Sequence, residues 1–120
     1  MAKNGVIGEI TLNTRKAADG RHPPFVTSIT LPATHPALPE GTILIGGSDP
    51  GTAALAAATL GTQTLFGVLD EAVEANEEVG NVLIHGSCPA EVLVTVATNG
   101  ATTPASADLI KALRGIGIYV

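Results

Sequence analysis

A histidine and a cysteine lie three residues apart in the segment His85-Gly86-Ser87-Cys88. Such a pair can form a thiolate and an imidazolium, which is the chemistry of a small thiol hydrolase. Residues three apart on a strand point to opposite faces of a sheet, however, and Gly86 with Pro89 predicts a tight bend between two strands. We therefore interpret the segment as structural, and hydrolysis through Cys88 is the weaker alternative.

Three histidines and a cluster of acids are the other side chains that could bind an ion. His22, His35 and His85 lack the short paired spacing of a zinc motif, so we predict no metal site. The acids lack the alternating oxygen ligands of a calcium loop, and we expect them to form a solvated hairpin face. These acids are Asp70, Glu71, Glu74, Glu77 and Glu78.

Other classes of site lack the residues they need. Neither Gly46-Gly47 nor Gly115 with Gly117 lies between a strand and a following helix, as a phosphate-binding loop would, so we predict no cofactor. A biotin- or acyl-carrier module needs an exposed lysine in a central hairpin turn, and no lysine of the chain lies in one. With two phenylalanines, one tyrosine and no tryptophan, the chain also lacks stacking platforms for nucleic acid. We expect a structural protein and no enzyme.

Charge is distributed unevenly along the 120 residues, whose formal net charge is −5. Residues 1–21 hold four basic residues against two acids, whereas residues 22–120 hold two basic residues against nine acids. A basic N-terminal segment on an acidic domain indicates a docking arm more than a nucleic-acid-binding surface, because the acidic domain would repel the phosphates of a nucleic acid. The single cysteine and the absence of a signal-like or membrane-spanning apolar run predict a soluble protein made in a reducing cytoplasm.

The N-terminal third has two distinct parts. Residues 5–12 alternate weakly in the manner of a strand, and no segment nearby in sequence is an obvious partner. Residues 22–39 hold five of the eight prolines, which predicts a stiff extended connection with at most an edge strand at Phe25 to Leu31. We therefore expect an extended N-terminal arm and proline-rich strap over residues 1–40 and a β-rich domain over residues 41–120.

The β-rich domain is expected to be built around a sheet. Thr42 to Ile45 is a short apolar strand, and residues 68–75 and 79–86 flank the loop Asn76-Glu77-Glu78 as the two strands of a hairpin. Residues 49–61 carry the local marks of a helix, with an Asp-Pro start, an alanine-rich run and a closing glycine.

One helix is predicted near the C-terminus. A further apolar strand over residues 91–97 and a run of small polar residues over 98–104 precede it. Ser106 can cap this helix and Gly115 can stop it. The apolar side chains that share its face are Leu109, Ile110 and Leu113.

The pattern of residues 38–120 resembles that of the head decoration proteins of lambda-type tailed bacteriophages. The resemblance is strongest from Gly67 to Val120 and is carried by Gly67-Val68-Leu69, the acidic hairpin, the turn at Gly86, Val92-Leu93, and the helix followed by an apolar end. It implies a mainly β, β-clip-like small domain with one short C-terminal helix. It also implies a strand and turn within residues 49–61, and we favour that extended form over the helix.

The resemblance further implies a capsid cement protein on the virion. Such a protein binds the outside of an expanded capsid as a homotrimer at three-fold and quasi-three-fold sites, with the major capsid protein of its phage as partner. It has no catalytic role and makes no direct contact with nucleic acid or membrane. A phage tail or adhesion protein is the alternative closest in kind.

Our hypothesis for the capsid contact places it in the arm. An extended strand can add to the edge of a capsid-protein sheet, and basic residues beside it can meet an acidic capsid surface. The proposed strand contacts are Val6, Ile7, Ile10 and Leu12, and the proposed charged contacts are Lys3, Arg15, Lys16 and Arg21.

Overall fold

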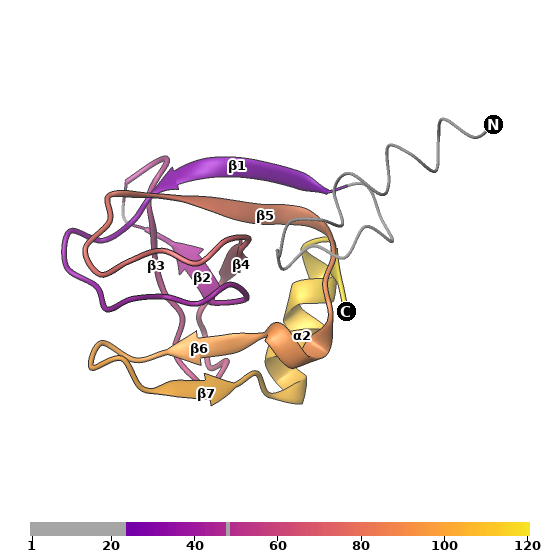
Figure 1. The fold of residues 1–120 in the computed structure, drawn as a ribbon. Coiled ribbons are helices and arrows are strands. Elements are labelled where there is room, and N and C mark those ends of the chain that lie inside the picture. Colours follow the sequence, from indigo (N-terminus) through magenta and orange to yellow (C-terminus); the bar gives the residue numbers. More distant parts are fainter. Residues whose placement is uncertain (1–23, 48) are drawn as a thin grey trace, which may run out of the picture.

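The main sheet dominates the computed structural model, which describes residues 24–47 and 49–120 (Figure 1). Five of its strands follow the order β1-β5-β4-β2-β3, and β8 pairs with β5 off this path. Neighbouring strands are antiparallel, except that β5 and β8 run parallel. Their bounds are Phe25–Thr30 for β1, Ile43–Gly46 for β2, Ala53–Leu55 for β3, Leu65–Leu69 for β4, Val79–Ser87 for β5 and Ile118–Tyr119 for β8.

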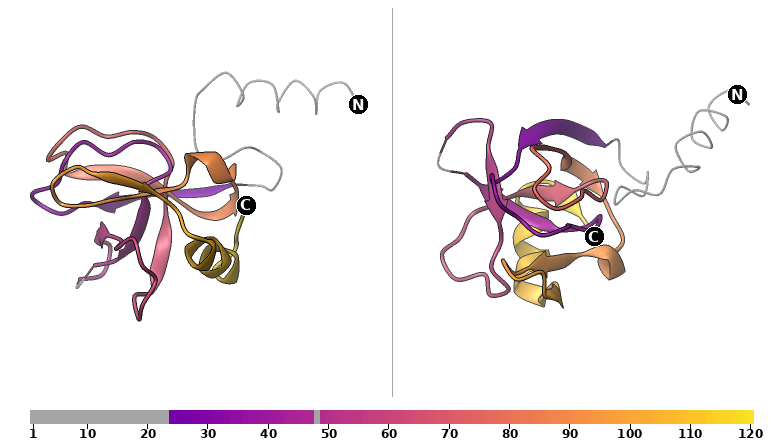
Figure 2. Two further views of the ribbon diagram at one scale, coloured as in Figure 1. Left: turned by 90° about the horizontal axis from the view of Figure 1, so that it is seen from below. Right: turned by 60° about the vertical axis from the view of Figure 1, so that its left-hand side comes forward.

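A second, two-stranded sheet lies beside the first. It pairs β6 (Val94–Val96) with β7 (Thr102–Pro104), and a 3₁₀ turn at Ala90–Val92 leads into it. The backbone N–H of Val94 donates to the carbonyl oxygen of Gly41 at 3.1 Å, which ties this sheet to the start of β2. The α-helix α2 (Ala107–Gly115) follows and lies to one side of the strands (Figure 2).

The main sheet is buried on both faces. Val68 and Leu83 pack with Leu109 of α2, whereas their chain neighbours Leu69 and Val82 pack in a second cluster. Because successive side chains of a strand point to opposite faces, each of these strands contributes to two cores at once. The largest fully buried side chains are all aliphatic, as expected for a chain with three aromatic residues.

The structure confirms the mainly β fold and the helix near the C-terminus. Ser106 caps α2, since its side-chain oxygen accepts a hydrogen bond from the backbone N–H of Leu109 at 3.3 Å. Leu109 and Leu113 are buried beneath the helix, and the helix ends at Gly115. Among the described residues, no helix has the length and hydropathy needed to cross a bilayer.

Two further expectations are confirmed. Residues 49–61 form no helix and contain the short strand β3, which pairs with β2. The proline-rich strap does contain an edge strand, β1, which pairs with β5 along its whole length. Since β1 belongs to the main sheet, the sheet takes in residues on both sides of the expected boundary between residues 40 and 41.

The hairpin was predicted with the wrong strands. The strand that precedes the acidic loop is β4, which ends at Leu69, so residues 70–75 belong to the loop. The reason lies in the strap: Val73 and Leu38 exchange two backbone hydrogen bonds of 2.9 Å, which draws the segment away from β5.

The prediction was also wrong in two places after the hairpin. Gly86 is no turn, because its backbone N–H donates to the carbonyl oxygen of Gly117 at 3.1 Å and β5 runs on to Ser87. The run of small polar residues at 98–104 was assigned no element, and its last residues form β7, which pairs with β6. Residues 91–97 are correspondingly divided between the 3₁₀ turn and β6.

Candidate docking surface

The described part of the molecule has two contrasting ends. We call the terminal end the one where β1 begins, β5 ends and β8 closes the chain, and Figure 1 shows the C-terminus there. The loop end is formed by residues 31–40 and 70–78, next to the other end of the β1-β5 pair. Each end collects a different kind of side chain.

Three rings lie across neighbouring strands at the terminal end, and we call Phe25, His85 and Tyr119 the ring patch. Phe25 of β1 is the cross-strand partner of His85 of β5, at a register shift that follows between Phe25 and Val26. The rings of His85 and Tyr119 meet edge to face, with centroids 6.0 Å apart and an interplanar angle of 84°. Phe25 is 62% exposed and Tyr119 is 41% exposed.

Backbone contacts hold the ring of Tyr119 beside His85. The carbonyl oxygen of Tyr119 accepts from the backbone N–H of Cys88 at 2.9 Å. Gly117 has a φ of 99°, and a Cβ built there would lie 2.7 Å from Cδ2 of His85. Glycine is therefore needed at this position, both for the left-handed backbone and for the close passage of the chain past the imidazole.

The location of the aromatic residues makes the ring patch unusual. The chain has only three aromatic residues of the Phe, Tyr and Trp types, and only Phe66 packs against a core cluster. Ile116, next to β8, adds another exposed apolar side chain at this end. Contiguous exposed apolar side chains mark interaction sites more often than scattered ones do. The ring patch is therefore the best candidate docking surface among the described residues.

The loop end is closed by its own hydrogen bonds. His35 is 4% exposed, with Nδ1 2.7 Å from the carbonyl oxygen of Pro36 and Nε2 2.7 Å from that of Glu77. Its backbone N–H donates to Oδ1 of Asn76 at 3.0 Å, and the backbone N–H of Asn76 donates back to the carbonyl oxygen of His35 at 3.0 Å. These contacts fasten the strap to the acidic loop.

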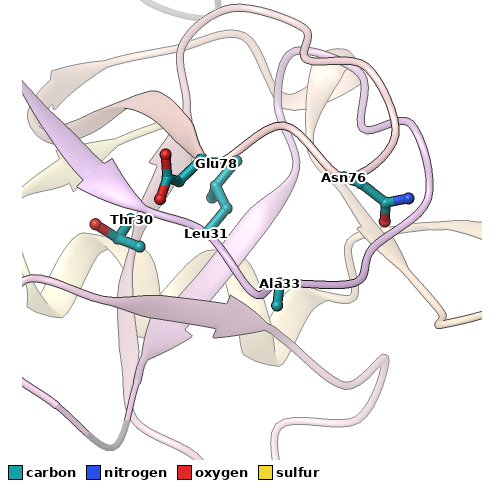
Figure 3. A pocket seen from close by; sticks show the side chains of 5 residues that line it. All are labelled: Thr30, Leu31, Ala33, Asn76 and Glu78. Atoms are coloured by element: carbon teal, nitrogen blue, oxygen red, sulfur yellow. The ribbon is translucent and has the colours of Figure 1, made fainter.

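A hollow opens beside these contacts of His35, where the end of β1 meets the loop that contains Asn76 and Glu78 (Figure 3). Of the residues that line it, Glu78 alone carries a charge, and the backbone N–H of Leu31 donates to the Glu78 carbonyl oxygen at 2.8 Å. The polar side chains of the hollow are the Glu78 carboxylate, the Thr30 hydroxyl and the Asn76 amide, and among the described residues no histidine or second carboxylate lines it to complete a catalytic set. The lining residues are Thr30, Leu31, Ala33, Asn76 and Glu78.

The predicted arm contacts lie outside the described residues. The strand contacts and the basic contacts all fall within residues 1–23, and so does His22. Their assignment stays a prediction. The residues concerned are Lys3, Val6, Ile7, Ile10, Leu12, Arg15, Lys16 and Arg21.

The structure separates the side chains that suggested chemistry. Cys88 is buried in the core cluster with Leu109, whereas His85 is exposed and contacts Tyr119. His35 lies at the loop end, away from His85 at the terminal end. Residues 24–47 and 49–120 contain no group of three His, Cys, Asp or Glu side chains that could hold a metal ion.

Sequence reasoning missed the ring patch. Its members are distant in sequence, and the pairing of β5 with both β1 and β8 brings them together. The available signal was position: a chain with so few aromatic residues places two of them at the beginning of a proline-flanked strand and next to the C-terminal residue. No protein-family model matches the chain, and no curated protein shows significant similarity to it.

Proposed function

We propose that this chain is a structural virion protein that binds the outside of an expanded phage capsid and stabilises it. It acts as a homotrimer at three-fold and quasi-three-fold sites, with the major capsid protein as its partner. The proposal concerns attachment and shape, and it assigns no reaction to the protein.

The observation that carries the proposal is the residue pattern from Gly67 to Val120, which resembles that of lambda-type head decoration proteins. The order of elements supports it, since the acidic loop joins two paired strands and α2 is followed by a terminal strand. Gly67 lies on β4, and a Cβ built there would come within 2.6 Å of the Leu83 carbonyl oxygen. Close packing against β5 therefore explains why this position of the pattern is a glycine.

Burial of the single thiol also favours a role without catalysis. Cys88 has no exposed surface and lies among aliphatic side chains that include Leu109 and Leu113. A catalytic thiol must reach its substrate and needs a partner that stabilises the thiolate. Cys88 lacks the access, and the histidine nearest to it in sequence is turned to the surface.

Attachment through the arm explains how a small protein can hold a shell together. Residues 5–12 add as a strand to a sheet of the capsid protein, where backbone hydrogen bonds give affinity and alternate side chains give specificity. Ordering an arm costs conformational entropy, so a single arm binds weakly. Three arms on one trimer act at a high effective concentration and must all leave before the trimer is released.

Stabilisation of the shell then follows from linkage. A ligand that binds only the assembled, expanded shell lowers the free energy of that state and opposes disassembly. Closure around a three-fold axis limits further association of the bound copies.

The test is co-sedimentation of the purified protein with shells of its parent phage that lack it, before and after expansion. The proposal predicts saturable binding to expanded shells only, with three copies at each site. Failure to bind either form would overturn the cement function and favour a tail or adhesion role.

A further inference from the structure

We infer that the ring patch is a second shell contact: Phe25, His85 and Tyr119 dock on an apolar area of the major capsid protein that is flanked by carboxylates. The inference rests on the proposed function and adds to it a surface of the folded domain, separate from the arm. It assigns the terminal end to the shell and the loop end to the outside.

The connection between arm and patch is the first argument. Phe25 begins β1, and the 23 residues that precede the described chain join the domain one residue before it. Phe25 follows Leu12 by thirteen positions, and a fully extended chain of that many steps spans about 45 Å at most. When the arm is bound, the ring patch is therefore confined near the same shell surface at high effective concentration.

The distribution of charge is the second argument. At the terminal end, the guanidinium Nη2 of Arg114 donates to the carbonyl oxygen of Val120 at 3.3 Å, and four further basic residues precede the domain in residues 1–21. At the loop end, Glu74, Glu77 and Glu78 are exposed. A shell surface that carries carboxylates attracts the first end and repels the second, which orients the domain before contact.

The rigidity of the patch is the third argument. Tyr119 is held through its backbone by Cys88, and its ring contacts His85, which lies on the longest strand of the sheet and pairs through its backbone with Phe25. Aromatic side chains have few rotatable bonds, so burying them on a partner costs little conformational entropy. Exposed rings on a fixed backbone are typical of the few residues that dominate an interface.

The experiment compares a patch variant with a matched control, both with the arm intact. The patch variant carries Phe25→Ser and Tyr119→Ser. The control carries Val79→Ser, because Val79 is 48% exposed and lies at the other end of β5. Titration of expanded shells should show affinity about tenfold or more weaker for the patch variant and within about twofold of wild type for the control.

Tyr119 provides a second readout, because it is the only tyrosine in the chain. Tetranitromethane should nitrate it in the free protein and fail to do so in the shell-bound protein. This readout uses the wild-type protein, so it holds even if the patch variant folds poorly, which circular dichroism and thermal unfolding would reveal.

Five results would overturn the inference, and they are distinguishable. Wild-type protein that does not bind shells would overturn the proposed function and the inference with it. Wild-type protein that binds while the patch variant binds equally well, or while Tyr119 is nitrated as in the free protein, would leave the function and remove the patch contact. Equal weakening by the Val79→Ser control would show a general surface effect. A patch variant that no longer forms the wild-type oligomer in analytical ultracentrifugation would show that the rings contact another copy of this chain instead.

Discussion

The loop end and the terminal end lie at opposite ends of the same pair of strands, β1 and β5. They differ in the burial of their rings. At the loop end, the ring of His35 is buried and both of its nitrogens lie against backbone carbonyl oxygens. At the terminal end, the ring of His85 is exposed and meets the ring of Tyr119, and the backbone partner of His85 is the exposed Phe25.

This difference in burial indicates which end contributes to the stability of the domain on its own. A buried imidazole that contacts backbone on both sides stabilises the fold, because its removal leaves a cavity and takes away a donor from a buried carbonyl oxygen. Exposed rings add little to the stability of the free domain, since most of their apolar surface stays in water. The loop end is therefore a structural element, and the terminal end is the part of the domain that we propose a partner covers.

The largest expected effect concerns the arm that leaves the terminal end. Replacing Ile10 and Leu12 with Asp should reduce binding to expanded shells by about a hundredfold or more, because buried unpaired carboxylates cannot replace apolar contacts in an added strand. Co-sedimentation would measure the loss. The matched control carries Asp at Asn13 and Thr14, which adds the same charge just beyond the strand. Equal loss in both variants would show that charge alone weakens binding, and undiminished binding by the first would contradict strand addition.

The same substitution at the two histidines should separate the ends by their effect on stability. His35→Ala should lower the free energy of unfolding by about 3 kcal/mol, because it removes a buried side chain and its contacts with two carbonyl oxygens. His85→Ala should change it by less than about 0.5 kcal/mol, as is usual for exposed positions. Urea unfolding of both variants would measure the difference. Equal losses of stability would contradict the distinction between the two ends.

A smaller effect is expected at Asn76, which exchanges hydrogen bonds with the backbone of His35. Asn76 has a φ of 62°, and its side-chain oxygen accepts the hydrogen bond from the His35 backbone. Asn76→Gly removes that hydrogen bond, but glycine adopts the positive φ without strain, so the free energy of unfolding should fall by about 1 kcal/mol. Asn76→Ala loses the bond and strains the backbone as well, which should cost about 2 kcal/mol. Alanine no worse than glycine in thermal or urea unfolding would show that the backbone conformation is unimportant.

Local signals were sufficient where an element depends on its own residues. Ser106 and Gly115 predicted both ends of α2, because capping and termination act within one turn. The prolines limited the strap to an edge strand, and β1 is one. The sheet itself was predictable from its apolar segments.

Non-local pairing explains what the sequence could not show. Val73 looked like part of a hairpin strand, but it exchanges hydrogen bonds with Leu38 in the strap. Residues 102–104 are only three residues within a run of small polar residues, too short for a strand pattern of their own, yet they pair with β6. The ring patch depends on two such pairings at once, which bring the strands of Phe25 and Tyr119 beside β5. The ring patch could therefore be recognised only once the strand pairing was known.

The most direct test of the account is an electron cryo-microscopy reconstruction of expanded shells saturated with the wild-type protein. We predict three copies around each three-fold and quasi-three-fold position, with the start of β1 and the C-terminus against the shell and the acidic loop pointing outward. Unoccupied three-fold positions would contradict the cement function, and copies bound through the loop end would contradict the assignment of the terminal end as the docking surface.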